Sequence, residues 1–270
     1  MAKRILFVRS GGGMPGIDVH LGMWAALEQF AIVATDCSGT SAGAIVSAID
    51  ATGYSAARAI SIVRNLKDED VRREVPFWKF RIPWIDSYLR QEPIRQVLDG
   101  LLKGLKADKP LQVWAADRMS GDPCNLLSDP PAPLVDAVLA SMSISGVFPP
   151  VKIGDDYFVD GGVAVNLPVP RDLAPYDEVW LLVAAGSPKD YQKNTGILTC
   201  LMRNIDFLMI GQLRESILDA SAGWPSKKVR VLWPTIHRRG GAFHFDHDLI
   251  GEAYMWTKTK LQELQDGGLL

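Results

Sequence analysis

The chain of 270 residues is 47% hydrophobic and 22% charged, and its formal net charge is −2. A chain of this length can bury a full core, so we expect one domain over residues 1–270. The balanced charge argues against wholesale nucleic-acid binding, which requires a basic surface.

The cysteines and the apolar runs bear on where the protein works. Cys37, Cys124 and Cys200 are odd in number and widely spaced, which fits a reducing compartment and gives no pattern for zinc or redox chemistry. The apolar run at residues 5–8 is too short for a signal peptide, and no uninterrupted apolar stretch approaches the ~20 residues of a membrane span. We therefore expect a cytoplasmic protein.

The first elements predict a crossover unit of a parallel sheet. Residues 4–9 form a buried first strand, and the glycine-rich loop at residues 11–16 follows directly. A helix then begins near Ile17, and a second strand covers residues 32–35. Strand, loop, helix and strand in this order form the right-handed crossover of parallel strands.

The rest of the chain continues to alternate helices and strands. Apolar periodicity and capping signals predict helices over residues 42–51, 55–66, 93–105, 134–143, 197–220 and 250–264. Strands are expected over residues 111–116, 179–184 and 229–233, with a hairpin over residues 152–159. The sequence therefore predicts an α/β chain with a mainly parallel central sheet.

A serine between two glycines lies where a strand turns into a helix. Gly39-Thr40-Ser41-Ala42-Gly43 follows an apolar run and precedes the helix at residues 42–51, the context of a G-x-S-x-G nucleophile elbow. Glycine two positions before and after the serine relieves crowding on a tight turn, and the helix N-terminus favours developing negative charge. The alternative is an ordinary Gly/Ser turn that caps a helix.

The first glycine loop allows two uses. Gly11-x-Gly13-x-x-Gly16 satisfies the dinucleotide-binding fingerprint, and Asp36 ends the second strand as a ribose-binding acid would. The chain would then be an NAD(P)-binding oxidoreductase. The same glycines could instead direct two backbone N–H groups at one point and stabilise an oxyanion. Because both loops end parallel strands at one edge of the sheet, they would face each other across a crevice.

A serine nucleophile needs a base, and two kinds are available. The loop at residues 237–247 holds three histidines, so a triad of Ser41, Asp160 and His247 can be formed; its composition resembles a metal site, without a recognised ligand spacing. We expect His20, on a predicted helix, at the surface. Asp160 is the better candidate for the base, because two glycines after it let a substrate approach closely. The alternative is an aspartate that opens a turn.

The segment at residues 76–88 interrupts the pattern of helices and strands. Aromatic residues alternate with Lys79 and Arg81, and Pro76 and Pro83 oppose regular structure. One hypothesis is an interfacial lid, since Trp and Phe favour the boundary of a bilayer and cations are attracted to anionic lipid. The other is that these aromatic residues pack over the edge of the sheet.

Three signatures in this order resemble those of patatin-like phospholipases: Gly11-Gly12-Gly13, Gly39-Thr40-Ser41-Ala42-Gly43 and Asp160-Gly161-Gly162. The flanking segments are similar too, residues 140–151 reading ASMSISGVFPPV and residues 159–169 reading VDGGVAVNLPV. The likeness covers about residues 4–185, and residues 186–270 would complete the same domain with helices and a strand.

The resemblance implies a three-layer α/β/α sandwich and a Ser-Asp dyad. Ser41 would attack an ester carbonyl, Asp160 would accept its proton, and backbone N–H groups of Gly11, Gly12 and Gly13 would form the oxyanion hole. Water would then hydrolyse the acyl-enzyme, with no metal or other cofactor. Five further glycines support the motifs: Gly16, Gly39, Gly43, Gly161 and Gly162.

The implied substrate is a lipid ester, reached through transient contact with a membrane surface. A catalytically inactive lipid-binding module is the alternative that is not an enzyme. Two positions depart from the family pattern: Pro15 stands where Arg or Lys is usual, and Ser145 stands where proline is common. Pro15 supplies no cation for a phosphate or headgroup.

Overall fold

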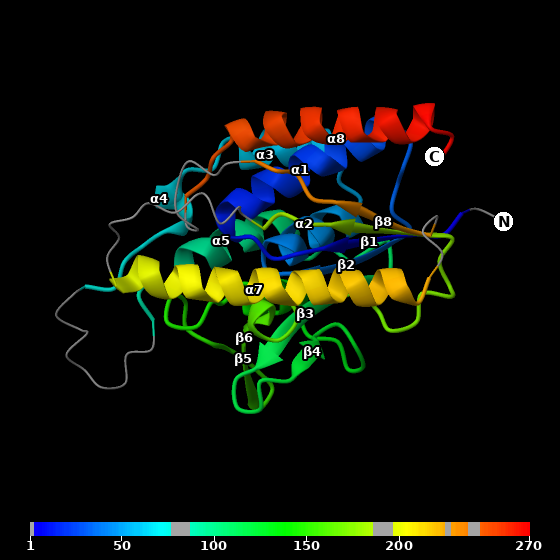
Figure 1. Ribbon diagram of the computed structural model, residues 1–270. Helices are drawn as coiled ribbons and strands as arrows, with labels where there is room; N and C mark the ends of the chain where they lie inside the picture. Colours follow the sequence, from blue (N-terminus) through cyan, green and yellow to red (C-terminus); the bar gives the residue numbers. More distant parts are fainter. Residues whose placement is uncertain (1–2, 77–86, 186–196, 225–227, 237–243) are drawn as a thin grey trace.

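The computed structural model describes residues 3–76, 87–185, 197–224, 228–236 and 244–270 (Figure 1). Its centre is an eight-stranded sheet with the order β5-β6-β3-β2-β1-β7-β8, and β4 pairs only with β3. The strands are β1 (Ile5–Arg9), β2 (Asp36–Thr40), β3 (Leu111–Asp117), β4 (Pro123–Asn125), β5 (Val151–Ile153), β6 (Asp156–Asp160), β7 (Glu178–Leu182) and β8 (Val229–Leu232). Strands β3, β2, β1, β7 and β8 run parallel, whereas β4 and β6 pair antiparallel with β3 and β5 pairs antiparallel with β6.

Helices cover both faces of the sheet, which gives the three-layer α/β/α fold that the sequence predicts (Figure 1). They are α1 (Gly13–Gln29), α2 (Ala42–Ala51), α3 (Ala56–Val63), α4 (Asp68–Val71), α5 (Glu92–Leu102), α6 (Leu134–Ser141), the short η2 (Gly161–Val163), α7 (Ile197–Ala222) and α8 (Asp248–Asp266). Side chains alternate across β1: Phe7 packs with α1 and α2 in the larger core, whereas Leu6 and Val8 pack with Leu213 of α7 in the smaller one.

The position of the second strand differs from the sequence prediction. It covers Asp36–Thr40 and not residues 32–35, and all five of its residues are buried between β1 and β3. Small polar residues fit this central strand because they find partners: the Ser38 hydroxyl donates to the Pro168 carbonyl at 3.1 Å, and the Thr40 hydroxyl donates to the Val165 carbonyl at 2.9 Å. Ser41 therefore follows the strand directly.

The first helix also begins earlier than expected, at Gly13 instead of near Ile17. The glycine loop is thus shortened to the turn between β1 and α1. Pro15 is buried in the first turn of α1, where its missing N–H breaks no helical hydrogen bond. The strand β4 is an addition that no sequence pattern indicated, because it spans only three residues.

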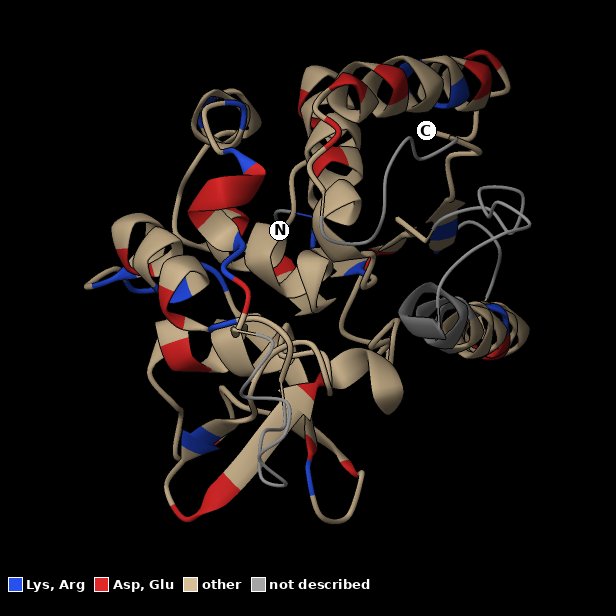
Figure 2. Cartoon of the chain, turned by 90° about the vertical axis from the view of Figure 1, so that its left-hand side faces the viewer, with Lys and Arg blue, Asp and Glu red and all other residues tan. Residues whose placement is uncertain are grey.

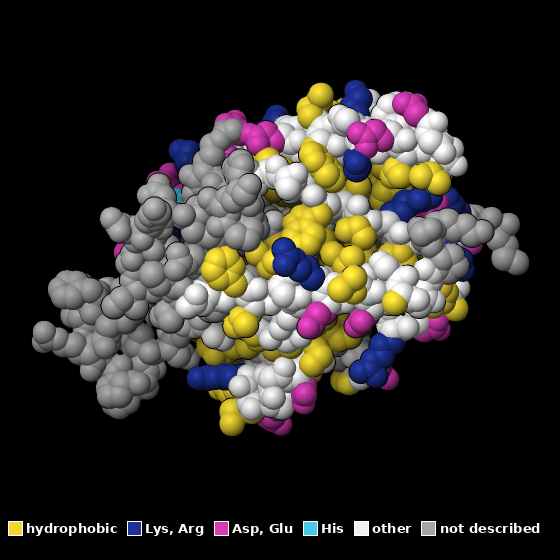
Figure 3. All heavy atoms as spheres, viewed as in Figure 1, with side chains coloured by type: hydrophobic (Ala, Val, Ile, Leu, Met, Phe, Trp, Pro, Cys, Tyr) yellow, Lys and Arg dark blue, Asp and Glu magenta, His cyan; other side chains and the backbone are white. Residues whose placement is uncertain are grey.

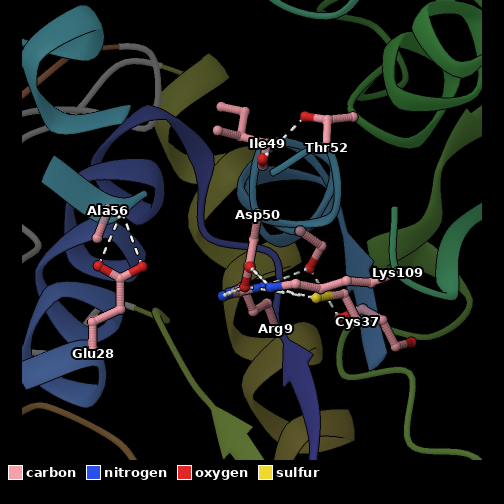
Figure 4. A network of polar contacts seen from close by, with 10 residues as sticks. Arg9, Glu28, Cys37, Ile49, Asp50, Thr52, Ala56 and Lys109 are labelled. Atoms are coloured by element: carbon pink, nitrogen blue, oxygen red, sulfur yellow. Dashed lines mark hydrogen bonds and ion pairs between the residues drawn. The ribbon is translucent and has the colours of Figure 1, made fainter. Parts of the chain in front are cut away.

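A buried ion pair joins β1 to α2 (Figure 4). The Arg9 guanidinium is fully buried and lies 2.6 Å from the Asp50 carboxylate, which also accepts from the Lys109 ammonium at 2.6 Å. The sequence predicts a buried strand at residues 4–9 but gives no partner for its arginine. Burial raises the pKa of the neighbouring Cys37 thiol to about 12, so this cysteine stays protonated and unreactive.

The surface mixes both signs of charge. Basic and acidic residues both occur along the helices and loops of the chain trace in Figure 2, in keeping with the net charge of −2. Hydrophobic side chains gather on the face that α7 crosses (Figure 3), and α7 exposes Phe207, Leu208 and Leu218.

Among the described helices, none combines the length and the apolar character of a membrane span. The segment expected as a lid, at residues 76–88, lies outside the described residues except at its ends.

Candidate active site

The serine elbow has the geometry that the sequence predicts. Ser41 links the end of β2 to α2 with φ 54° and ψ −122°, a backbone conformation that side-chain-bearing residues rarely adopt. A Cβ on Gly39 would lie 2.4 Å from the Gly43 carbonyl oxygen, and one on Gly43 would lie 2.3 Å from that of Arg9. Both positions therefore require glycine, and the turn presents Ser41 at the carboxyl edge of the parallel strands.

Asp160 ends β6 and is almost completely buried, at 1% exposed. Its Oδ1 accepts the N–H of Gly162 at 2.7 Å, while Oδ2 has no hydrogen-bond partner of ordinary length and angle among the described residues. Burial raises the pKa of Asp160 to about 6, against the lowering effect of the Ser41 hydroxyl and the Gly162 N–H. The hydroxyl thus lies near enough to affect the carboxyl, in a contact that substrate can tighten.

Residues at the end of α6 form hydrogen bonds with both Ser41 and Asp160. The Ser41 N–H donates to Ser141 Oγ at 2.9 Å, and that hydroxyl donates to the Trp114 carbonyl at 2.6 Å. Two residues on, the Ser143 carbonyl accepts the N–H of Asp160 at 2.9 Å. The sequence assigned no role to these two serines, although Ser-x-Ser at the end of an apolar helix was the available signal.

The three amides expected in the oxyanion hole differ in their hydrogen bonding. The Gly11 N–H donates to Asn166, whose backbone carbonyl oxygen lies at 3.1 Å and whose Oδ1 lies at 3.0 Å. Because this amide already has an acceptor, we no longer expect Gly11 to contribute to the oxyanion hole. Gly12 caps α1 and Gly13 is its first residue; within the described ranges their amides have no acceptor. A Cβ on Gly12 would lie 2.7 Å from the Ala184 carbonyl oxygen.

Asn166 is a further residue that the sequence did not single out. It is 2% exposed and ties the strand end at Gly11 to the segment after Asp160. The sequence feature that could have indicated Asn166 is its single amide side chain among mostly apolar residues in the VDGGVAVNLPV segment. The remaining motif glycines lie close by: a Cβ on Gly16 would meet Cβ of Ala42 at 3.2 Å, and one on Gly161 would meet the Trp114 carbonyl oxygen at 2.4 Å.

The hydrogen bonds of His247 go to residues other than the candidate dyad. His247 contacts Asp18 at 2.9 Å through Nδ1 and the Leu66 carbonyl at 3.1 Å through Nε2, so both ring nitrogens are occupied outside the site. The triad of Ser41, Asp160 and His247 is therefore not assembled. The expectation of a surface position for His20 is wrong, because it is fully buried and its Nε2 lies 2.8 Å from the Ser10 carbonyl oxygen.

The described part of the histidine loop shows no metal site. His244 lies 2.5 Å from Asp68 and 3.3 Å from Arg72, and His237 lies outside the described residues. In the ranges that the structure covers, no group of three or more His, Cys, Asp or Glu side chains is arranged to hold a metal ion.

The position of Asp36 disfavours the dinucleotide fingerprint. A ribose-binding acid ends the second strand, near the glycine loop. Asp36 instead begins β2, at the opposite edge of the sheet, where it accepts from the Arg4 guanidinium at 2.9 Å. The first glycine loop therefore lacks the acid that the oxidoreductase interpretation requires.

Two hollows adjoin the candidate dyad. A narrow pocket beside Ser41 is lined by residues of α1, α2 and the segment after α6, among them Gly13, Met142 and Phe148. A groove on the other side lies between Gly162 and α7 and is lined in part by Phe207 and Leu208. Both hollows present mainly apolar side chains, as a site for a lipid would.

The comparison with known families agrees with this geometry. The profile of the family described as patatin-like phospholipase matches residues 7–173, which include all three glycine-containing signatures. The chain belongs to the patatin-like phospholipase family. Membership supports a hydrolase of lipids as the general class.

Two relatives by sequence are described as uncharacterised proteins. An NTE family protein of Mycobacterium tuberculosis is 32% identical over 176 residues, which cover 62% of this chain and 29% of the relative. The protein YqhO of Bacillus subtilis is 30% identical over 194 residues, covering 60% of this chain and 64% of YqhO. The matched region thus spans less than a third of the mycobacterial relative.

A solved structure shares the fold. VipD from Legionella pneumophila aligns over 97% of this chain and 67% of its own, with a TM-score of 0.52 and 14% sequence identity. At this identity, the likeness extends to the arrangement of helices and strands, which is that of a patatin-like three-layer sandwich.

Proposed function

We propose that this chain hydrolyses carboxylic esters of lipids, phospholipids among them, through a dyad of Ser41 and Asp160 in a single domain. The observation that carries the proposal is the strained Ser41 turn beside a buried carboxyl whose pKa is raised to about 6. A general base acts best when its pKa lies near the working pH. At neutral pH Asp160 is mostly ionised and has an oxygen free to accept a proton.

The reaction proceeds in two steps. Asp160 takes the proton of the Ser41 hydroxyl as Oγ attacks the ester carbonyl carbon, and the carbonyl oxygen becomes an oxyanion. The amides of Gly12 and Gly13, at the N-terminus of α1, donate to that oxyanion. The ester C–O bond breaks, the departing alcohol takes the proton from Asp160, and the acyl group stays on Ser41.

Water completes the cycle. It attacks the acyl carbonyl and gives a proton to Asp160, the bond to Ser41 Oγ breaks, and Oγ regains the proton as the fatty acid leaves. A carboxylate is a weak base toward serine, so the geometry set by Ser141 and Ser143 has to compensate for the mismatch in pKa. Among the site glycines, Gly39, Gly43 and Gly161 allow close approach of neighbouring backbone atoms, whereas Gly16 and Gly162 leave room for side chains.

Hydrolysis of p-nitrophenyl acyl esters and of phospholipid vesicles by wild type and Ser41→Ala tests the proposal. We expect hydrolysis of both substrates by wild type and the loss of at least 99% of it in Ser41→Ala, with an unchanged circular dichroism spectrum. Retained activity in Ser41→Ala would rule out Ser41 as the nucleophile. A folded wild type that cleaves no ester and no phospholipid would favour a lipid-binding module, and saturable NADH or NADPH binding would revive the oxidoreductase.

A further inference from the structure

A buried network of polar side chains joins β1, which precedes the glycine loop, to α2, which begins after Ser41 (Figure 4). The Arg9 guanidinium is 0% exposed, lies 2.6 Å from Asp50 Oδ2 and donates to Ser47 Oγ at 3.2 Å; both partners belong to α2. The Ser47 hydroxyl in turn donates to the Ser38 carbonyl of β2 at 3.2 Å. One side chain of β1 therefore holds α2 against the sheet.

Arg9 contacts both parts of the candidate site. It is the last residue of β1, two positions before Gly11, where the glycine loop begins. Its carbonyl oxygen packs against the elbow, since a Cβ on Gly43 would lie 2.3 Å from it. Its side chain binds α2, whose N-cap is Ser41. The glycine loop and the serine turn are thus carried on two elements that the same residue joins.

Stability alone does not account for a charged network at this place. Within the described ranges, Arg9 Nε has no hydrogen-bond partner, and Asp50 draws a second cation, Lys109, to 2.6 Å. Apolar side chains often replace a buried ion pair without loss of stability, because desolvation of the charges offsets their attraction. Apolar contacts do not reproduce the direction of the bonds, since hydrogen bonds of a guanidinium fix both distance and angle.

We propose that Arg9 is a positioning residue, which sets the distance from Ser41 to the donors of the oxyanion hole. The inference rests on the proposed function, because it takes Ser41 as the nucleophile and the amides of Gly12 and Gly13 as those donors. A shift of α2 along β1 would move the nucleophile without changing any group that contacts the substrate. Since a misplacement of about 1 Å can cost about 100-fold in rate, the chemical step should suffer more than substrate binding.

Replacing the ion pair by apolar side chains separates positioning from stability. Asp50→Leu alone leaves the Arg9 charge buried without its carboxylate, so this variant should melt well below wild type. Arg9→Met/Asp50→Leu removes both charges and should melt near the wild-type temperature. For this double variant we expect kcat with p-nitrophenyl butyrate to fall about tenfold or more, and KM to change less than about twofold.

An ion pair at the opposite edge of the sheet provides the matched control. Glu178 begins β7 and lies 3.4 Å from Arg230 of β8, and their side chains are 8% and 10% exposed. Arg230→Met/Glu178→Gln removes both charges, and the glutamine keeps an acceptor for the Trp180 indole N–H. We expect wild-type kcat from this control. If Arg9→Met/Asp50→Leu regains wild-type kcat together with stability, the network only supports the fold and the inference is overturned.

Ser47→Ala provides the test if the double variant does not fold. The substitution removes only the hydroxyl that lies between the Arg9 guanidinium and the Ser38 carbonyl. We expect kcat to fall about threefold or more at unchanged KM, because the lost hydrogen bonds loosen α2 against β2. An unchanged kcat in folded Ser47→Ala overturns the inference.

Hydrogen–deuterium exchange separates this inference from the proposed function. The Ala44 N–H donates to the Ser41 carbonyl at 2.9 Å, and the Gly16 N–H donates to the Gly12 carbonyl at 3.1 Å, so these amides report on the elbow and the glycine loop. We expect both to exchange about tenfold faster or more in the double variant, and at the wild-type rate in the control. That result supports positioning by Arg9 even if wild type cleaves no ester. Unchanged exchange in a folded double variant refutes it, whether or not Ser41 is catalytic.

Discussion

The side chain of Ser141 accepts the hydrogen bond of the Ser41 amide in its strained turn. A residue other than glycine at φ 54° carries strain of about 1–3 kcal/mol, which the surroundings must hold in place. The buried N–H of Ser41 has its acceptor in Ser141, and Ser141 is anchored on the Trp114 carbonyl. The proposed nucleophile is therefore positioned from α6, by a side chain 100 residues further along the chain.

Ser141→Ala should lower kcat by about 10- to 100-fold with little change in KM. The substitution leaves the Ser41 amide without its acceptor, which costs about 1–3 kcal/mol and releases the turn. Steady-state kinetics and denaturant unfolding measure the two effects separately. Ser141→Cys, which keeps a weak acceptor, should recover part of kcat. A loss of stability without any change in kcat would show that Ser141 supports the fold and not the position of the nucleophile.

The raised pKa of Asp160 links activity to stability. In the folded protein, the Asp160 carboxyl keeps its proton up to about pH 6, whereas in the unfolded chain it loses the proton near the ordinary aspartate pKa of 3.8. Between these values the folded state binds more protons than the unfolded state, so the carboxyl makes stability fall as pH rises. Above pH 6 the full penalty applies, on the order of 3 kcal/mol at about 1.4 kcal/mol per pKa unit.

Asp160→Asn should therefore be inactive and yet more stable than wild type at pH 8. We expect the stability difference to shrink toward zero at pH 4, and kcat/KM of wild type to rise with a midpoint near pH 6 as the base ionises. Urea unfolding at both pH values and a pH–rate profile are the measurements. Asp155→Asn, in the exposed turn between β5 and β6, is the control. A difference in stability independent of pH would contradict the raised pKa.

Among the elements, α8 is tied closely to α1 although it lies beyond the family match. A Cβ on Gly22 of α1 would lie 2.3 Å from the Ile250 carbonyl oxygen and 2.8 Å from the Cβ of Ala253. Glycine thus lets the two helix backbones approach. Leu249 and Leu261 of α8 are fully buried in the larger core, so the C-terminal segment shares its packing with the motif-bearing part.

Gly22→Ala should lower the melting temperature by roughly 5 °C or more, since the added methyl group meets backbone atoms of α8 that cannot move aside. Gly251→Ala, on α8 itself, has nothing within 4 Å and should be neutral or slightly stabilising. Differential scanning calorimetry compares the two. One shifted transition in Gly22→Ala supports a single domain over residues 1–270. A separate low-temperature transition would show that α8 unfolds on its own.

For the whole molecule, local patterns predicted the fold better than the exact placement of its elements. The three signatures and the alternating helices and strands indicated a three-layer α/β/α sandwich with Ser41 on a strand-to-helix turn. The position of β2 could not be predicted, because Ser38 and Thr40 lack the apolar character of a buried strand and depend on distant partners, the carbonyl groups of Pro168 and Val165. Tertiary packing outweighs local propensity there.

Long-range polar contacts account for the rest of what the sequence did not reveal. The pairing of Arg9 with Asp50 joins residues 41 positions apart, and that of His247 with Asp18 joins residues 229 positions apart. The supports of the candidate site are equally distant: Ser141 lies 100 positions from Ser41, and Asn166 lies 155 from Gly11. A periodic pattern within one segment cannot indicate polar contacts between residues that are so far apart in the sequence.

Covalent labelling by an alkyl fluorophosphonate tests the account most directly, because it requires an activated serine and no particular lipid. Intact mass and peptide mapping locate the adduct in wild type, Asp155→Asn and Asp160→Asn. The account predicts a single adduct on Ser41 in wild type and Asp155→Asn, formed at least 100-fold more slowly in folded Asp160→Asn. A folded wild type without an adduct on Ser41, or labelling of Asp160→Asn at the wild-type rate, would contradict it.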